Sequence, residues 1–428
     1  MPMLIKGGRV IDPGHLDEYH DILIAEGRIG AVRPKGSIDL EGEDLRVIDA
    51  KGLWVTPGLI DMHVHFREPG QEYKETILTG SQAAAAGGFT AVCTMPNTDP
   101  VNDGPAVTAQ ILEKARAAGL VKVYPVAAIS MGLAGQQLSE FGELKAAGAI
   151  GVSDDGCPVA NNLLMRRALE YAADFGLRVI SHCEEPQLAD GGVMNEGALA
   201  TRMGLAGIPN ACESVMVMRD IALADLTGVP VHIAHVSTRE SVMAIRRAKA
   251  DGIPVSAETA AHYFILTEDA VQGYDTHAKM NPPLRSEADR RAIIQGVADG
   301  TLDAIASDHA PHAAEEKQVE FDRAANGITG LETSLPLGLR LVAEKQLDIG
   351  QLIDRMSIAP ARILGLERGI KKGLPADLTL IDPLKAWTLR ARDSKSLSRN
   401  TPFDNWPLQG KAVMTIIDGA VKLDELQG

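Results

Sequence analysis

Residues 58–66 have the sequence GLIDMHVHF, a short apolar run that is typical of a buried strand. This is the first of eight such runs, and Ala-rich helical stretches that often end in glycine lie between or after them. The alternation predicts a parallel sheet covered by helices, and eight repeats favour a closed (β/α)8 TIM barrel over an open doubly wound sheet. The predicted strands are residues 58–66, 89–95, 121–129, 149–155, 177–183, 229–236, 253–259 and 302–308.

Both ends of the chain have a different pattern. Residues 1–55 and 366–428 contain short predicted strands between turns rich in Gly, Asp and Pro. Neither stretch is long enough to bury a hydrophobic face alone. We therefore expect them to pack together as one small β-sandwich domain beside the barrel of residues 56–365.

The amino-acid composition argues against some classes of binding partner. The 428 residues include 42 Lys+Arg and 57 Asp+Glu, which gives a formal charge of -15. This balance opposes binding to nucleic acid or to an anionic membrane, because both need a basic face. No apolar run reaches the ~18 residues of a membrane helix, and the first residues, MPMLIKGGRVID, lack the pattern of a signal peptide. The expected location is the cytoplasm.

The ends of the predicted strands carry residues that bind metals. Active sites of TIM barrels lie at the carboxyl ends of the strands. His63 and His65 are two residues apart, so they share one face of their strand. A lone His-x-His pair is more often a pair of core histidines, but here six candidate ligands fall on five strand ends, which favours a binuclear metal site. They are His63, His65, Asp155, His182, His235 and Asp308.

Two aspartates compete for the end of the fourth strand. Alternation of side chains allows only one of Asp154 and Asp155 to face inward. We favour Asp155 because it lies at the extreme end of the strand. A carboxylate can bridge two cations, one on each oxygen, and lower the net charge. Asp308 could bind a metal, move a proton, or do both.

Several polar residues in the loops of the same rim are candidates for substrate binding. Arg67 lies just past the first strand, where its guanidinium could bind a carboxylate. Taken singly, residues of these types are more often loop caps or surface residues. We predict that they bind substrate because all four lie on the same rim of the barrel: Arg67, Asn97, Asn281 and His312.

Several motifs together resemble one family. The stretch DMHVHFREPG, combined with MPNTDP, SDDG, KMNPPLR and SDHAPH, resembles the bacterial type I dihydroorotases of the amidohydrolase superfamily over essentially the whole chain. The resemblance implies reversible zinc-dependent cyclisation of N-carbamoyl-L-aspartate to L-dihydroorotate in pyrimidine (UMP) biosynthesis. Other branches of the superfamily bridge their metals with a carboxylated lysine, and the GVSDDG of this chain fits the dihydroorotases instead.

The resemblance also assigns roles and partners. The six strand-end residues match metal positions, which implies two Zn²⁺ per subunit, and Asp308 is also implied as the catalytic proton carrier. The residues at substrate positions are His65, Arg67, Asn97, Asn281, His312, Asn326 and Gly327, the last two in a stretch whose backbone contacts the pyrimidine ring. A homodimer is expected, and an association with aspartate transcarbamoylase is a further possibility.

Two other functions remain open from the sequence. One is a hydrolase of hydantoin, dihydropyrimidine or allantoin, which Arg67, Asn97 and Asp155 oppose. The other is a catalytically silent homologue that serves as a structural partner. Such a protein should have lost metal ligands, and this chain keeps the whole set.

Overall fold

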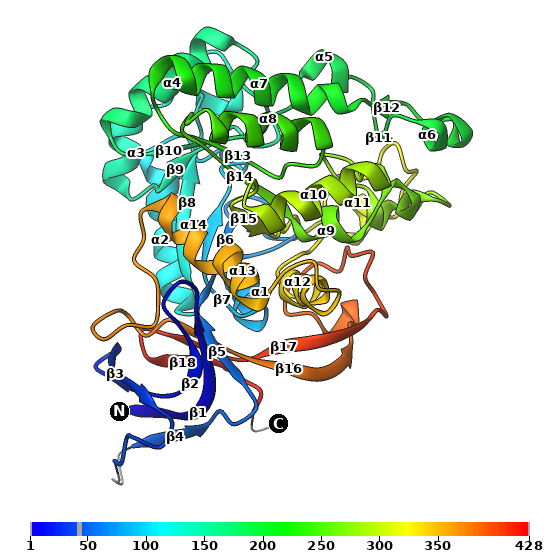
Figure 1. The fold of residues 1–428 in the computed structure, drawn as a ribbon. Helices are drawn as coiled ribbons and strands as arrows, with labels where there is room; N and C mark the ends of the chain where they lie inside the picture. Colours follow the sequence, from blue (N-terminus) through cyan, green and yellow to red (C-terminus); the bar gives the residue numbers. More distant parts are fainter. Residues whose placement is uncertain (1, 41–44, 427–428) are drawn as a thin grey trace.

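The computed structural model describes residues 2–40 and 45–426. Eight parallel strands within these residues form a barrel (Figure 1). They follow the chain order around it, and the barrel closes where Val64 pairs with His309, just beyond the last strand. The barrel strands are β6 (Leu59–Val64), β7 (Phe89–Thr94), β8 (Lys122–Ala127), β9 (Gly151–Val152), β10 (Arg178–Ser181), β13 (Val231–Ile233), β14 (Val255–Ala260) and β15 (Ala304–Ala306). The predicted fold is confirmed.

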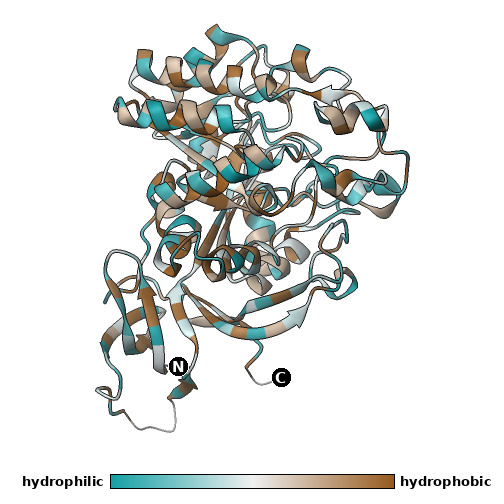
Figure 2. Ribbon diagram, turned by 45° about the vertical axis from the view of Figure 1, so that its right-hand side comes forward, coloured by the Kyte–Doolittle hydropathy of each residue, from teal (hydrophilic) through white to brown (hydrophobic). Residues whose placement is uncertain are grey.

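Helices surround the barrel (Figure 1), and buried hydrophobic residues of the helices join those of the strands in one cluster. Figure 2 marks the hydrophobic residues of both in brown. Local sequence sets their ends: Thr76 begins α1 with a capping box, and Gly119 ends α2 in the left-handed conformation (φ 60°) that glycine adopts most easily. The larger helices are α1 (Ile77–Ala86), α2 (Pro105–Ala118), α3 (Phe141–Ala147), α4 (Asn162–Asp174), α7 (Asn210–Thr227), α8 (Arg239–Ala250), α10 (Glu287–Asp299) and α12 (Ser334–Ala343).

Shorter elements lie in the loops and near the end of the barrel. The loop between β10 and α7 holds two short helices and a pair of two-residue strands. These elements are α5 (Pro186–Ala189), α6 (Ala198–Met203), β11 (Met194–Asn195) and β12 (Gly207–Ile208), followed later by α9 (Ala261–Ile265), α11 (Ala314–Lys317), α13 (Ile349–Ile353) and α14 (Ala359–Leu364). None of the helices in the described residues combines the length and apolar character needed to cross a bilayer.

Strands from both ends of the chain form a second sheet, below the barrel in Figure 1. Strand β5 lies between β1 and β16, so the two ends are joined by main-chain hydrogen bonds. The strands are β1 (Met3–Asp12), β2 (Leu16–Ala25), β3 (Arg28–Pro34), β4 (Arg46–Asp49), β5 (Trp54–Pro57), β16 (Leu378–Thr388), β17 (Pro407–Ile417) and β18 (Ala420–Asp424). They enclose a separate hydrophobic core. The expected division of the chain at residues 55 and 365 stays a prediction.

A buried ion pair ties this sheet to the barrel. Asp377, just before β16, accepts hydrogen bonds from Arg368 (2.7 Å) and from Lys122 (2.9 Å) at the start of β8. The Arg368 and Asp377 side chains are each 5% exposed. The amino ends of TIM-barrel strands serve stability rather than catalysis. The pair therefore belongs to the framework of the protein.

We expect Asp377→Asn to lower the free energy of unfolding by about 3 kcal/mol, because it leaves the Arg368 charge buried without its partner. Urea denaturation of a matched variant, Asp418→Asn, should change the same free energy by less than about 0.5 kcal/mol, since the Asp418 side chain is 59% exposed. Equal midpoints for the two variants would contradict the assignment.

Candidate metal centre and active site

The six predicted ligands meet at one end of the barrel. His63 lies on β6, and the other five follow the carboxyl ends of β6, β9, β10, β13 and β15. All are buried, with 0% to 7% of their surface exposed. The structure therefore brings together residues that are up to 245 positions apart in the sequence, from His63 to Asp308.

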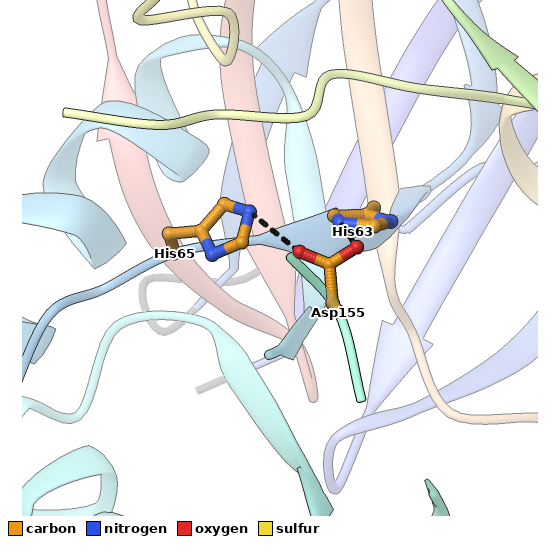
Figure 3. Close-up of side chains that lie close together, drawn as sticks. All are labelled: His63, His65 and Asp155. Carbon is orange, nitrogen blue, oxygen red and sulfur yellow. Dashed lines mark ion pairs between the residues drawn. The ribbon is translucent and has the colours of Figure 1, made fainter. Parts of the chain in front are cut away.

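Asp155 lies at the centre of this cluster. Its Oδ1 is 3.2 Å from His63 Nε2, and its Oδ2 is 3.5 Å from His65 Nε2 (Figure 3). These three residues can each offer one ligand atom, and the atoms lie within 4.8 Å of one another. One metal ion can be held by such a set of two imidazoles and a carboxylate.

A second group shares the same carboxylate. Asp155 Oδ1 is 3.2 Å from His235 Nε2 and 3.4 Å from His182 Nδ1, and these two ring nitrogens are 2.8 Å apart. Asp155, His182 and His235 form the other group of potential ligands within 4.8 Å. The two groups overlap only at Asp155, which is the arrangement a bridging carboxylate requires.

Asp308 lies on the side of the first group. Its Oδ1 is 3.3 Å from His65 Nε2 and 3.8 Å from His63 Nε2. The residue has a positive φ of 48°, and so does His235 at 31°. Such backbone conformations are uncommon outside glycine and often occur at functional sites.

The competing aspartate points elsewhere. Asp154 accepts hydrogen bonds from the backbone N–H (2.9 Å) and the hydroxyl of Ser130. Those bonds fix the loop after β8. Asp154 thus supports a neighbouring loop, and Asp155 faces the histidines.

The cluster stabilises positive charge. Burial alone would lower the pKa of His182, but hydrogen bonds to Asp155 and Glu184 outweigh it and raise the pKa to about 10. Burial would raise the pKa of Asp308, yet the hydrogen bond with His65 and the charge of His63 lower it to about 2. Asp308 is therefore a carboxylate at neutral pH and can accept a proton.

The residues present fit a metal. Among the described residues, His63 Nε2 and His182 Nε2 are buried without a hydrogen-bond partner. Leaving a buried polar atom unpaired is costly, and a cation supplies a partner for such an atom. Four imidazoles and two carboxylates are ligands that Zn²⁺ and related divalent ions accept. The cluster is therefore able to bind metal.

Sequence reasoning missed the residues behind the ligands. Glu258 on β14 is fully buried, and its Oε1 lies 3.1 Å from His63 Nδ1. Its Oε2 lies 3.4 Å from His232 Nε2. A carboxylate on the far nitrogen of a ligating histidine fixes the ring orientation and raises its basicity. The ETA segment at 258–260 gave no signal, because a single strand glutamate has no distinctive spacing.

Asn97 plays a similar part for His65. Its Oδ1 accepts a hydrogen bond from His65 Nδ1 at 2.8 Å, which directs His65 Nε2 toward Asp155. The amide nitrogen of Asn97 is then the group left for the predicted contact with substrate. Asn281 donates to Glu184 Oε2 at 2.6 Å, and that carboxylate is 3.7 Å from His182 Nε2.

Arg67 and His312 form a buried pair on the rim. Arg67 Nε donates to the carbonyl of Pro311 at 3.2 Å, and its Nη2 lies 3.3 Å from His312 Nε2. Burial lowers the pKa of Arg67 to about 10, so the guanidinium remains charged at neutral pH. Burial and the Arg67 charge lower the pKa of His312 to about 3, which keeps its imidazole neutral.

Asn326 and Gly327 lie beside this pair. The Asn326 carbonyl is 2.8 Å from His312 Nε2, and the Asn326 side chain is exposed. The N–H of Gly327 donates to the Lys279 carbonyl at 3.0 Å. Its own carbonyl accepts from Lys317 (3.1 Å) and Asn400 (3.0 Å). The backbone carbonyls of both residues thus meet protein side chains, and the substrate contacts expected of Asn326 and Gly327 stay predictions.

Sequence comparisons agree with this geometry. Over 423 residues the chain is 57% identical to a dihydroorotase of Geotalea daltonii, an alignment that covers 98% of this chain and 99% of the relative. A dihydroorotase of Desulforapulum autotrophicum is 55% identical over 421 residues, with the same two coverages. The chain belongs to the dihydroorotase family. The family model described as Dihydro-orotase-like matches residues 52–241.

Solved structures extend the likeness to the superfamily. The L-hydantoinase (dihydropyrimidinase) from Arthrobacter aurescens superimposes with a TM-score of 0.88 at 26% identity, covering 99% of this chain and 96% of its own. A dihydropyrimidinase from Brevibacillus agri has a TM-score of 0.86 at 23% identity, covering 99% and 95%. The second match shows a shared fold alone. As a member of the dihydroorotase family, the chain is an enzyme.

We expect Glu258→Gln to weaken metal binding by about 10- to 100-fold, since the amide no longer holds His63 Nδ1 with a full charge. Titration of the metal-free protein with Zn²⁺ or Co²⁺ measures this affinity. The control is Glu240→Gln on α8, whose side chain is 38% exposed and pairs with Arg239 instead of a ligating histidine. Wild-type affinity in Glu258→Gln would remove the residue from the metal centre.

Proposed function

We propose that this member of the family is a working dihydroorotase. It would catalyse the reversible, zinc-dependent cyclisation of N-carbamoyl-L-aspartate to L-dihydroorotate in pyrimidine (UMP) biosynthesis. The single observation that carries the proposal is Asp155 shared between two pairs of histidines, in a chain 57% identical to a dihydroorotase. The complete ligand set argues against a silent homologue.

Two Zn²⁺ ions per subunit are the proposed cofactors. One would be held by His63 and His65, the other by His182 and His235, with Asp155 shared and Asp308 beside the first. When bound, such a metal pair polarises the amide carbonyl and lowers the pKa of a water molecule. The protein contributes the fixed positions of the imidazoles and the burial that excludes other solvent.

Asp308 is the proposed proton carrier. Its carboxylate is buried and ionised, and it faces the same space as His65 Nε2 at 3.3 Å. During hydrolysis of dihydroorotate, Asp308 takes the proton of the attacking water and delivers it to the departing ring nitrogen. In the direction of ring closure, Asp308 takes the proton from the ureido nitrogen and returns it to the leaving oxygen.

Arg67 and His312 are proposed to hold the carboxylate of the substrate. Arg67 uses Nε on the Pro311 carbonyl, so the outer edge of its planar guanidinium remains for a carboxylate. The amide nitrogen of Asn97 and the Asn281 side chain would add polar contacts, and the main chain at Asn326 would border the ring. A charged clamp of this kind separates orotate-type substrates from neutral hydantoins and dihydropyrimidines.

The remaining proposals concern assembly. We propose a cytoplasmic homodimer that also associates with aspartate transcarbamoylase, and a chain divided into a barrel of residues 56–365 and a β-sandwich of residues 1–55 and 366–428. Size-exclusion chromatography with light scattering tests the dimer. Mixing with purified aspartate transcarbamoylase tests the association.

We expect Asp308→Asn to lose about 10²- to 10⁴-fold in turnover, because the amide cannot accept the proton. Metal content should stay close to that of the wild type, since five other ligands remain. Ring-opening absorbance gives the rate, and elemental analysis gives the metal content. Wild-type turnover in this variant would remove Asp308 from proton transfer.

Arg67→Met should raise KM for dihydroorotate about 10- to 100-fold, because a charged, buried hydrogen bond to the carboxylate is lost. The wild type should hydrolyse dihydroorotate in preference to hydantoin and dihydrouracil, which have no carboxylate. In the variant this preference should shrink. A wild-type preference for the neutral rings would instead support a hydantoinase activity.

A further inference from the structure

The segment that borders the proposed substrate pocket is held by buried polar side chains. Residues 322–327 connect α11 and its following turn to the Ile328 bridge beside His309. This segment has no regular secondary structure of its own, so its backbone carbonyls need partners from elsewhere. Those partners come from four side chains outside the segment, namely His312, which meets the Asn326 carbonyl, and Lys279, Lys317 and Asn400.

Lys317 is the last residue of α11 and is only 1% exposed. Its Nζ lies 2.7 Å from the Ala325 carbonyl, 3.1 Å from the Gly327 carbonyl and 3.3 Å from the Lys279 carbonyl. An ammonium group has three N–H donors, and three carbonyl acceptors face it here. Lysine is almost never this deeply buried unless its charge is compensated, so the position is costly and specific.

Asn400 approaches the same point from the chain segment before β17. Its Nδ2 donates to the Gly327 carbonyl (3.0 Å) and the Ala310 carbonyl (2.9 Å). Its Oδ1 accepts from the His312 N–H at 3.0 Å. Asn400 therefore links the backbone that carries His312 to the backbone that follows Asn326. All hydrogen-bonding groups of its amide are used in this link.

The geometry at Gly327 shows how closely the two backbones approach. Gly327 has a φ of 125°, and a Cβ placed on it would lie 2.5 Å from Ala310 Cβ. Only glycine fits there. Lys279 Nζ fixes the preceding residues by donating to the Asp322 (2.9 Å) and Ala324 (2.7 Å) carbonyls. The segment is thus anchored at both ends around Asn326.

We propose that Lys317 and Asn400 are positioning residues for substrate binding, which fix Asn326 and His312 at the barrel mouth through the carbonyls of residues 325–327. The inference rests on the proposed function, because it takes that mouth to be the substrate pocket. Neither residue reaches the metal ligands. Their loss should therefore weaken substrate binding and leave the metal centre and the proton carrier in place.

Several charged groups surround Lys317 and His312. Burial, together with the nearby Lys279 cation, lowers the pKa of Lys317 to about 7, while Asp275 and Glu316 oppose the shift. Glu316 also lies 3.3 Å from His312 Nδ1 and 2.8 Å from Lys74 Nζ. The Nδ1 of His312 thus meets this group of charges, and its Nε2 meets the Asn326 carbonyl.

The test compares Lys317→Met and Asn400→Leu with Lys372→Met, a control at an exposed lysine. The first two should raise KM for dihydroorotate about tenfold, the size expected when a buried hydrogen bond is lost. Their kcat should change less than about threefold and their metal content not at all. Hydrogen exchange at residues 322–327 should be faster than in the control without any substrate present.

Combining the two changes should give less than the product of their single effects, because both side chains bind the same Gly327 carbonyl. Unchanged KM in two folded variants, or equal losses in kcat and metal content, would overturn the inference. If Lys317→Met does not fold, Asn400→Leu still decides the question. An inactive wild type would contradict the proposed function instead, and the exchange measurement would still report on the anchoring.

Discussion

The structure depends on one buried negative charge, the carboxylate of Asp155. Four imidazoles surround it, with nitrogen atoms 3.2 to 3.5 Å from its oxygens. A buried carboxylate must be compensated by positive charge, either by protons on the histidines or by cations between them. The surrounding histidines come from three strands besides that of Asp155. They surround Asp155 only because the barrel is closed. The chemistry of the site therefore depends on the closure of the sheet.

The backbone at the strand ends is shaped around that meeting point. Arg67, His235 and Asp308 have positive φ values of 60°, 31° and 48°. A positive φ in a residue other than glycine raises the free energy of the folded state, which an ordinary backbone conformation at a strand end does not. Hydrogen bonds of the neighbouring backbone offset this free energy and hold the turns in place. The N–H of His65 donates to the His309 carbonyl at 2.8 Å, and the N–H of Val236 donates to the Glu258 carbonyl at 2.8 Å. Neighbouring strands thereby fix the turns that aim the side chains.

The sequence was most informative where function follows a local rule. Strand periodicity and the position of polar residues at strand ends were enough to predict the barrel. They were also enough to predict that His63 and Asp308 lie close together. Glu258, Lys317 and Asn400 could not be found in this way. Each acts on backbone or side-chain atoms brought close only by the tertiary fold, such as the 90 positions between Ala310 and Asn400. A lysine beside two glutamates in AEEK predicts an exposed helix, and its burial is visible only in three dimensions.

These contacts bear on how the chain is divided. Residues 389–406 lie between two strands of the sheet formed by both termini, yet they support the barrel mouth. Besides Asn400, the hydroxyl of Ser396 donates to Glu75, and the same carboxylate lies 3.2 Å from His309 Nε2. His309 is the residue whose pairing with Val64 closes the barrel. Hydrogen bonds that hold the barrel therefore cross the proposed sequence boundary at residue 365. The C-terminal stretch supplies Asn400 to the backbone behind the proposed substrate pocket and Ser396 to the seam of the barrel, so the barrel stretch alone lacks these contacts.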